Sequence, residues 1–327
     1  HTISQTVTGN INGLKALQRK SLERIYRRSV APSEVVSQDL ARYMAEISRD
    51  LRRQVGILVD RRGRIKHVVV GDTERLFLPD LGRQRAGRSR FRGLRLIHTH
   101  LAGEQLSRDD LTDLSLLQLD LIAVIQSDAL GHAASIEVAH LIPPSPSGKL
   151  WEVAKPVALH DHTLDFDAFI SDLEGQFASY QSTLTSRSDA ELAVAVHVAI
   201  RAPGERRPSE SLSELRELAR TAGIEIVEEL IQKRRQVDHR FVVGKGKLEE
   251  LVLASMQRGA ELIIFDRDLT PAQARSIADI TEAKVIDRTQ LILDIFAQRA
   301  TTAAGKLQVE LAQLKYALPR LAGKNTA

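Results

Sequence analysis

Short apolar runs alternate with amphipathic stretches through the second half of the chain. Residues 192–200 and 262–265 are nearly continuous apolar runs, which is typical of strands that are covered on both faces. Between them, apolar positions recur at helical spacing over residues 212–222, and a further strand is expected at residues 284–287. This alternation predicts an α/β fold with a mostly parallel βαβ domain over residues 190–286.

Helix-start signals mark two positions inside this domain. Ser211 and Glu214 have the spacing of a capping box, in which each side chain bonds the other residue's backbone N–H. Thr270, Pro271 and Gln273 combine an N-cap, a proline at the first helical position and a capping partner. We expect one helix to begin at each position.

The first half of the chain mixes helix and strand signals. Two apolar runs at residues 55–60 and 65–70 flank a turn that contains Gly63, which is the pattern of a β-hairpin. Ser33 offers an N-cap for a helix that runs through Met44. The predicted divisions are a basic helical extension (1–45), a mixed α/β domain (46–160), a linker helix (161–189), the parallel domain (190–286), a helical hairpin (287–322) and a final segment (323–327).

The hairpin is predicted from leucine spacing near the end of the chain. Leucines recur at steps of four and three residues over about two heptads, after a small, flexible tip at residues 301–305. They are Leu307, Leu311, Leu314, Leu318 and Leu321. Two short helices joined at this tip explain the pattern better than a long coiled coil.

Composition narrows the classes of protein. The chain has 327 residues and no cysteine, which excludes disulfides, thiolate metal ligands and a cysteine nucleophile and fits a reducing cytosol. No run approaches the roughly 18 apolar residues of a membrane span. The sequence begins with His1 and has no signal peptide, so we expect it to start within a longer chain.

Charge is unevenly distributed along the chain. Residues 1–110 carry 22 basic and 12 acidic side chains, a net charge of +10, although the whole chain is only +4. The run from Leu81 to Arg95 holds six arginines and no carboxylate: Arg83, Arg85, Arg88, Arg90, Arg92 and Arg95. Such a run either contacts nucleic-acid phosphates or is a solvated loop.

One group of residues has the spacing of a metal site. His98 and His100 are separated by one residue at the end of an expected strand, so both imidazoles point to one side. Asp110 follows one turn into the next expected helix and would supply a carboxylate. Alternatively, Ser107 and Asp110 serve only as the N-cap and first-turn acid of that helix.

This spacing resembles the His-x-His…Ser-x-x-Asp signature of JAMM-type zinc peptidases. It departs from it because six residues instead of seven separate His100 from Ser107. An acid that activates zinc-bound water would fall near Arg52 or Arg53, where no glutamate occurs. We therefore favour a degenerate fold relative without activity, in which Zn²⁺ is not expected. A metal site without peptidase activity stays open, and a zinc-dependent hydrolase using His98, His100 and Asp110 is the alternative.

Glycines and lysines open another expected helix, at Gly244, Lys245, Gly246 and Lys247. Backbone N–H groups at a helix N-terminus can bind phosphate, so this segment is a candidate nucleotide site. It matches neither a P-loop nor the dinucleotide-binding glycine pattern. An ordinary glycine turn with two exposed lysines is the competing interpretation.

Cationic residues flank the apolar stripe of the hairpin. They are Arg288, Arg299, Lys306, Lys315 and Arg320. A slender basic arm suits insertion into a ribonucleoprotein groove, where backbone contacts dominate. An ordinary packing hairpin would have the same pattern.

From about Ala193 to its end, the chain resembles the N-terminal region of HflX-type translational GTPases. The resemblance covers about 40% of the chain and rests on several motifs in order. They are Phe241–Leu251, Ile264–Asp266, Leu269–Gln273, Val285–Thr289, Leu291–Ala300, Gly305–Leu314 and Leu318–Leu321. The first ~190 residues more loosely resemble the extra N-terminal segment of some members.

The resemblance implies a cytoplasmic protein that binds the large ribosomal subunit and its rRNA, with no DNA partner, and that splits or rescues stalled ribosomes. It implies that the hairpin loop, with Arg299, Thr301, Thr302, Gly305 and Lys306, approaches the peptidyl-transferase region. GTP and Mg²⁺ would be used by a G domain that lies beyond this sequence, so the chain itself is not expected to hydrolyse GTP. ATP at residues 244–247 is a further implied ligand.

Overall fold

The computed structural model describes residues 6–81, 91–128, 130–145, 147–187, 190–200, 207–281 and 283–321. The chain forms two compact units, which are described separately: unit 1 comprises residues 1–143 and 149–181, and unit 2 comprises residues 144–148 and 182–327. The expected final segment 323–327 and four arginines of the basic run lie outside the described residues. Those arginines are Arg83, Arg85, Arg88 and Arg90.

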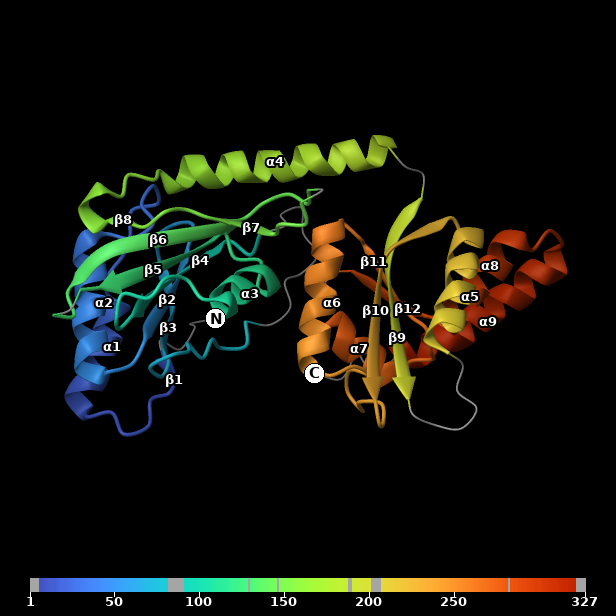
Figure 1. Ribbon diagram of the computed structural model, residues 1–327, viewed down its shortest axis with the longest axis horizontal. Coiled ribbons are helices and arrows are strands. Elements are labelled where there is room, and N and C mark those ends of the chain that lie inside the picture. Colours follow the sequence, from blue (N-terminus) through green and yellow to red (C-terminus); the bar gives the residue numbers. More distant parts are fainter. Residues whose placement is uncertain are drawn as a thin grey trace. The chain divides into compact units, whose positions relative to one another are not determined.

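Unit 1 is built on a mixed sheet with the strand order β1-β3-β2-β4-β5-β6-β7, and β8 pairs with β6 (Figure 1). The strands are β1 (Thr8–Gly9), β2 (Val55–Asp60), β3 (Ile65–Val70), β4 (Leu94–His100), β5 (Leu121–Ser127), β6 (Ala133–Leu141), β7 (Trp151–Val153) and β8 (Val157–Ala158). The antiparallel pair β2–β3 is the predicted hairpin, and β4 runs parallel to β5. The prediction of a mixed α/β domain is confirmed.

Four helices of the described residues belong wholly or mainly to unit 1. They are α1 (Ala16–Ile25), α2 (Gln38–Leu51), α3 (Arg108–Leu116) and α4 (Phe166–Arg187), with a short 3-10 turn, η1 (Leu159–Asp161). The side chains of Leu22 and Ile25 on α1 are fully buried, so this helix packs into the unit.

Helix α2 begins later than its sequence indicates. Ser37 caps it, with its side chain accepting a hydrogen bond from the Leu40 N–H. The predicted cap at Ser33 is wrong because Val35 and Val36 are buried ahead of the helix. The Ser33 carbonyl instead accepts a 2.7 Å hydrogen bond from the N–H of Phe166, the first residue of α4.

Unit 2 contains a parallel sheet with the strand order β10-β9-β11-β12. Its elements are β9 (Glu191–Ile200), α5 (Pro208–Thr221), β10 (Ile224–Arg234), α6 (Lys245–Arg258), β11 (Leu262–Phe265), α7 (Pro271–Ala278), β12 (Lys284–Asp287), α8 (Arg288–Arg299) and α9 (Ala303–Leu321). Alternate residues of β9 face opposite sides, where one core includes residues of α6 and α7 and the other includes residues of α5 and α8. The predicted parallel domain followed by helices is confirmed.

The two capping predictions in unit 2 have different outcomes. Thr270 and Gln273 form the predicted capping box at the start of α7. Ser211 is not a cap, because α5 already begins at Pro208. Ser211 is buried inside the helix, and its hydroxyl donates a 2.5 Å hydrogen bond to Asp266 instead.

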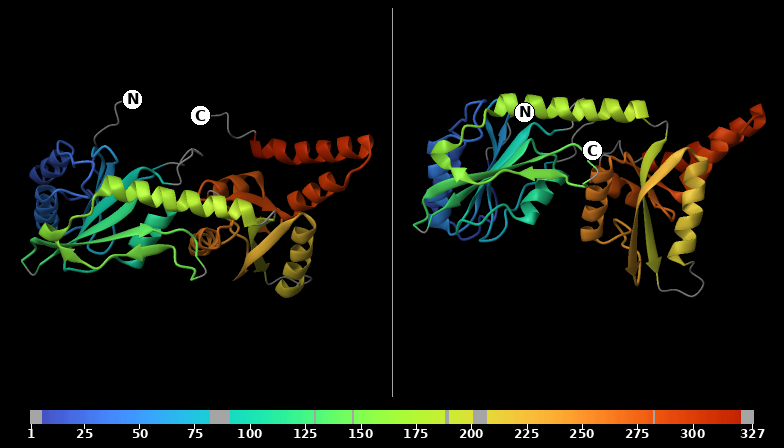
Figure 2. Two further views of the ribbon diagram at one scale, coloured as in Figure 1. Left: turned by 90° about the horizontal axis from the view of Figure 1, so that it is seen from above. Right: turned by 45° about the horizontal axis from the view of Figure 1, so that its top comes forward.

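Helices α8 and α9 form the predicted hairpin, and Figure 2 shows them in red, side by side. Gln313 on α9 donates a 2.9 Å hydrogen bond to Asp294 on α8. The leucine stripe does not form the interface between these helices. Four of its leucines are 52–67% exposed: Leu307, Leu311, Leu314 and Leu318.

Candidate functional site

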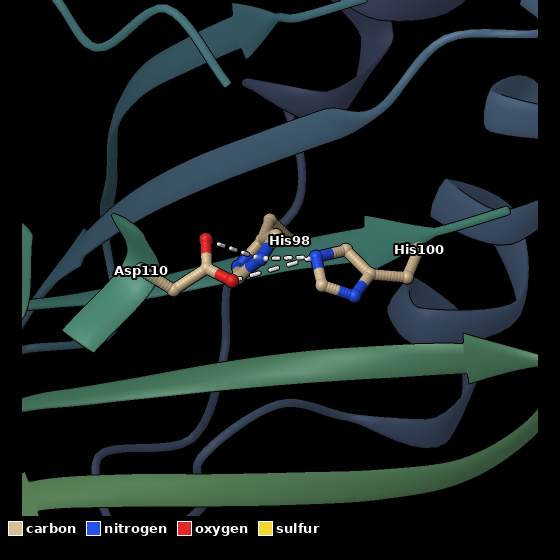
Figure 3. A group of neighbouring side chains, drawn as sticks. All are labelled: His98, His100 and Asp110. Atoms are coloured by element: carbon tan, nitrogen blue, oxygen red, sulfur yellow. Dashed lines mark hydrogen bonds and ion pairs between the residues drawn. The ribbon is translucent and has the colours of Figure 1, made fainter. Parts of the chain in front are cut away.

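The end of β4 and the start of α3 bring the predicted metal ligands together (Figure 3). Strand side chains alternate between faces, so His98 and His100 share one face while Thr99 points to the other. There the Thr99 hydroxyl donates a 2.7 Å hydrogen bond to Ser48 of α2. Ser107 then caps α3 in a capping box with Asp110, which turns the Asp110 carboxylate toward the histidines.

The three side chains present one tight set of ligand atoms. The two Nε2 atoms of His98 and His100 lie 3.1 Å apart. Asp110 Oδ1 is 3.2 Å from His98 Nε2, and Asp110 Oδ2 is 3.6 Å from His100 Nε2. The side chains of His98, His100 and Asp110 are 0%, 5% and 13% exposed, so water is largely excluded.

These separations fit the edges of a metal coordination tetrahedron. Zinc–nitrogen and zinc–oxygen bonds of about 2.0–2.2 Å place neighbouring tetrahedral ligands roughly 3.3–3.6 Å apart. The observed distances of 3.1, 3.2 and 3.6 Å lie at or just below this range. Three protein ligands would leave a fourth position for water or another ligand, as in catalytic zinc sites.

Neighbouring groups orient the ligands. His100 Nδ1 lies 3.0 Å from the Glu104 carbonyl oxygen, which can only accept, so the neutral ring carries its proton on Nδ1 and turns the Nε2 lone pair toward the centre. Asp110 Oδ2 accepts 2.7 Å hydrogen bonds from the N–H and the hydroxyl of Ser107. Among the described residues, His98 Nδ1 is buried without a hydrogen-bond partner.

The protonation states of His100 and Asp110 also favour the binding of a metal cation. Burial, followed by the charge of neighbouring His98, lowers the pKa of His100. Burial opposes ionisation of Asp110, but the contact with His98 and the hydrogen bonds from Ser107 outweigh it and hold its pKa below the usual range. At neutral pH the site therefore offers a neutral imidazole and an ionised carboxylate, which are the forms that bind divalent metals.

Gln54 is a neighbour that the sequence interpretation missed. Gly56 pairs with His98 in the antiparallel β2–β4 ladder, so continuing the register puts Gln54 opposite His100 and on its side of the sheet. Gln54 is 3% exposed, and its Oε1 atom has no partner among the described residues. A neutral amide can act as a ligand or acceptor, but it cannot take the part of a general base.

The glycine–lysine segment of unit 2 is engaged within its own surroundings. The Gly244 N–H donates a 2.9 Å hydrogen bond to Gln232, and a Cβ at Gly244 would lie 2.8 Å from Arg234 Nη1. Lys247 forms a 2.7 Å ion pair with Glu250 one turn along α6. Lys245 and Gly246 are exposed. Phosphate or ATP binding at these residues stays a prediction.

The structure separates the predicted ribosome-binding residues into two groups. Arg288 pairs with Asp266 at 2.8 Å and with Glu214 at 2.6 Å, and Arg320 pairs with Asp287 at 3.0 Å. Both arginine side chains are only 18% exposed. The other side chains of the set are exposed: Arg299, Thr301, Thr302 and Lys306 near the tip of the hairpin, and Lys315 one residue before Tyr316. Gly305 is half-buried, and its N–H donates to the Thr302 hydroxyl at 3.0 Å.

Asp287 joins both helices of the hairpin to the sheet. Its Oδ1 atom accepts a 2.9 Å hydrogen bond from the Gln290 N–H and so caps α8. Its Oδ2 atom accepts from the Leu269 N–H at 3.0 Å, from the Tyr316 hydroxyl and from Arg320 at 3.0 Å. Burial and the hydrogen bond to Asp287 raise the pKa of Tyr316 far above its ordinary value.

A second polar cluster at the carboxyl edge of the parallel sheet has no counterpart in the sequence interpretation. Asp266 follows β11 and accepts hydrogen bonds from Ser211 at 2.5 Å and Arg288 at 2.8 Å. His197 Nδ1 lies 2.9 Å from Asp266 Oδ2, and His197 is the one polar side chain in the long apolar run of β9. This isolated histidine is the sequence feature that could have indicated the cluster.

Comparison with known families covers only the later part of the chain. Residues 209–297 match the family model described as "GTP-binding GTPase N-terminal". Residues 299–327 match the model described as "GTP-binding GTPase Middle Region". The two matches are contiguous and include the parallel sheet from α5 onward together with the hairpin.

Curated relatives match the same part of the chain. The protein called GTPase HflX from Caldanaerobacter subterraneus is 51% identical over 114 residues, which cover 35% of this chain and 27% of the relative. GTPase HflX from Escherichia coli is 44% identical over 136 residues, which cover 41% of this chain and 31% of the relative. The match therefore spans less than a third of either relative's length.

Among solved structures, a GTP-binding protein from Sulfolobus solfataricus in complex with GDP shows 24% identity and a TM-score of 0.32, covering 40% of this chain and 39% of that one. A similarity this low supports no structural argument. From residue 209 onward, the family models and the sequence identities show that the chain is similar to the N-terminal and middle regions of HflX-type GTPases.

Proposed function

We propose that this chain is the ribosome-binding N-terminal region of an HflX-type GTPase, in which the hairpin α8–α9 contacts rRNA of the large subunit. GTP hydrolysis, with its Mg²⁺, belongs in this proposal to a G domain of the kind that the relatives' names imply. The proposed setting is the cytoplasm, and the proposed outcome is the splitting or rescue of stalled ribosomes. In the described residues no helix is long and apolar enough to cross a bilayer.

The observation that supports this proposal is the distribution of cations along the hairpin. Arg288 and Arg320 are held by carboxylates at its base. Arg299 and Lys306, near the tip, and Lys315, further along α9, are exposed and have no side-chain partner among the described residues. A slender arm with unpaired cations fits a groove between phosphate backbones, where contacts are mainly electrostatic.

Co-sedimentation with purified large ribosomal subunits over a salt series tests the proposal. The triple variant Arg299→Gln, Lys306→Gln, Lys315→Gln should bind more weakly and with a shallower salt dependence, by about one slope unit per lost phosphate contact. The triple variant Arg207→Gln, Lys233→Gln, Arg235→Gln removes the same charge from exposed positions of unit 2 outside the hairpin and is the matched control. Absence of pelleting at low salt, or equal losses in both variants, would contradict the proposal.

A metal site in unit 1 is a second proposed function, carried by the three ligand atoms of His98, His100 and Asp110. A transition metal such as Zn²⁺ would be held by two imidazoles and one carboxylate, and it would supply Lewis-acid chemistry at the open position. Gln54 is a neutral amide and cannot serve as a general base, so we propose metal binding without peptidase activity.

Metal analysis of the purified chain after exposure to Zn²⁺ tests this second proposal. Near-stoichiometric metal is expected in the wild type and in His132→Gln, which changes an exposed histidine. His100→Gln and Asp110→Asn should each lose it, and the losses should persist when Mn²⁺ replaces Zn²⁺. Retention of metal by both ligand variants would show that the metal binds elsewhere.

A further inference from the structure

The C-terminal half of α1 and the turn that follows it present a row of cations in unit 1. Lys20 and Arg24 lie on α1 four residues apart, and Arg27 lies in the following turn, where its N–H donates a 3.1 Å hydrogen bond to the Arg24 carbonyl. All three side chains are exposed, and residues three or four apart in a helical turn lie on the same side. None of the three has an ion-pair partner in the part of the chain that the structure describes.

The opposite face of α1 fixes this row on a rigid support. Leu22 and Ile25 are fully buried. The Tyr26 hydroxyl accepts a 3.0 Å hydrogen bond from the Val68 N–H and donates one of 3.0 Å to the Thr6 carbonyl. The Tyr43 hydroxyl of α2 donates a 3.0 Å hydrogen bond to the Ser21 carbonyl. These hydrogen bonds, at Ser21 and at Tyr26, therefore hold in place the backbone from which the cations project.

Nearby charge extends the basic character of the surface. Arg28 is exposed and lies with its guanidinium carbon 4.2 Å over the Tyr43 ring. From Lys15 to Arg28 there are six basic residues and one acidic residue, Glu23. A protein gains little stability from six neighbouring like charges, because they repel one another. Their presence on α1 and the residues that flank it is better explained by an anionic partner.

The structure favours a nucleic-acid backbone over a membrane surface. A helix that binds a bilayer buries its own apolar face in the lipid interface. The apolar face of α1 is already used in the core of unit 1, and on its exposed side Leu17, at 71% exposure, is the one large apolar side chain. A straight row of unpaired cations instead matches phosphates that repeat along a strand.

We propose that Lys20, Arg24 and Arg27 form an RNA-backbone contact of unit 1 that is separate from the hairpin of unit 2. The contact takes phosphates in a row and reads no base sequence, because lysine and arginine side chains on phosphates position a protein without specifying sequence. The choice of RNA as the source of the phosphates rests on the proposed ribosome-binding function. The position of the contact on α1 does not rest on it.

The test uses the full 327-residue chain and a 20-base-pair RNA duplex as the probe, with binding measured by fluorescence anisotropy over a salt series. The variant Lys20→Gln, Arg24→Gln, Arg27→Gln should reduce the slope of log affinity against log salt by about two to three. The control Arg62→Gln, Lys155→Gln, Lys233→Gln removes the same charge from exposed, scattered positions. It should leave the slope within half a unit of the wild type.

Three outcomes would overturn the proposal. An unchanged slope in the α1 variant would remove the contact, and an equal reduction in the control would show that only net charge matters. Stronger pelleting with phosphatidylserine vesicles than with RNA, lost in the α1 variant, would assign the row to a membrane instead. Because Gln replaces exposed side chains, circular dichroism should show an unchanged fold in both variants.

The same experiment separates this inference from the proposed function. The hairpin variant Arg299→Gln, Lys306→Gln, Lys315→Gln tests ribosome binding through unit 2, whereas the α1 variant tests unit 1. If the α1 variant binds large subunits and the duplex like the wild type, the further inference fails and the hairpin result still decides the proposed function. If instead the hairpin variant binds large subunits like the wild type and the α1 variant loses its salt-dependent binding to the duplex, the proposed function fails and the further inference stands.

Discussion

The two units each gather acidic and basic groups at strand ends, but with opposite results. At the end of β4, Asp110 faces two histidines and no fixed positive charge. At the end of β12, Asp287 receives hydrogen bonds from the N–H groups of Gln290 and Leu269 and from Tyr316 and Arg320. The first cluster has coordinating capacity left over, whereas the second is saturated by the protein itself.

The difference shows how a polar cluster can be classified before any ligand is known. A buried carboxylate is costly unless it is paired and hydrogen-bonded, so a cluster with every atom satisfied is explained by the fold alone. The Asp287 cluster meets this criterion, with Arg320 as its cation. The unit 1 cluster does not, because His98 Nδ1 has no hydrogen-bond partner among the described residues and no lysine or arginine there pairs with Asp110.

Breaking the saturated cluster should have the largest effect. Asp287→Ala removes the α8 cap and leaves Arg320 without its carboxylate, which we expect to destabilise the hairpin by about 3–5 kcal/mol. Hydrogen exchange of the α8 and α9 amides measures this directly. Asp287→Asn keeps a capping side chain and should cost less than the alanine variant. Equal protection in wild type and Asp287→Ala would contradict the assignment of Asp287 as the anchor.

Metal binding to the cluster of His98, His100 and Asp110 should stabilise unit 1. A metal present at a hundredfold above its dissociation constant stabilises the folded state by about 2.7 kcal/mol. Thermal unfolding followed by fluorescence of Trp151, the one tryptophan of the chain, reports on this unit. We expect Zn²⁺ to raise the melting temperature, chelation to reverse the rise, and His98→Gln to abolish it. A rise that survives in His98→Gln would place the metal at another site.

The negative charges near the metal-free cluster of unit 1 should also make its free energy of unfolding depend on pH. Burial, followed by the charges of Asp110 and Asp109, raises the pKa of Asp113 to about 6 from an ordinary 3.8. Because the folded state holds this proton more tightly, Asp113 contributes stability below the unfolded pKa, and that contribution is lost as the pH rises through about 6.

Asp113→Asn removes this titration. With chelator present, we expect the variant to be about 1–2 kcal/mol more stable than the wild type at pH 7.5, and equally stable near pH 3.5. Thermal unfolding at the two pH values, followed through Trp151, gives the comparison. Asp109→Asn, on a more exposed side chain, should show a smaller gain. A gain of the same size at both pH values would point to packing instead of charge.

The smallest expected effect comes from a single hydroxyl in the saturated cluster. Tyr316→Phe removes one of the donors to Asp287 while Arg320 and two backbone N–H groups remain, so the loss should be about 1 kcal/mol. Local hydrogen exchange in α9 measures it. A loss as large as that of Asp287→Ala would mean that the cluster depends on Tyr316 instead of on the charge pair.

Local sequence patterns predicted much of the fold. The apolar runs located β9, β11 and β12, the Thr270 box located the start of α7, and the His-x-His spacing located the ligand pair. These signals succeed because they depend on residues that are close together in the chain. The leucine stripe predicted the hairpin for a reason the structure does not support, since these leucines are largely exposed.

Tertiary partners account for what the sequence could not predict. Ser211 has the spacing of a cap, but Asp266, 55 residues away, takes its hydroxyl. From the sequence alone, Arg288 and Arg320 are expected to be free cations, but the structure pairs them with the strand-end carboxylates of Asp266 and Asp287. Gln54 is brought to the histidines only by the register of β2 against β4. In each case the deciding contact joins segments that no local pattern connects.

The anchoring of both hairpin helices at Asp287 has a mechanical consequence. Helix α8 has 12 residues, which corresponds to a lever of about 18 Å from its pivot at the end of β12 to the tip. A rotation of 10° at that pivot would displace the tip by about 3 Å, roughly the length of one hydrogen bond. The aim of the arm is thus determined at the edge of the sheet, far from the residues that it would deliver.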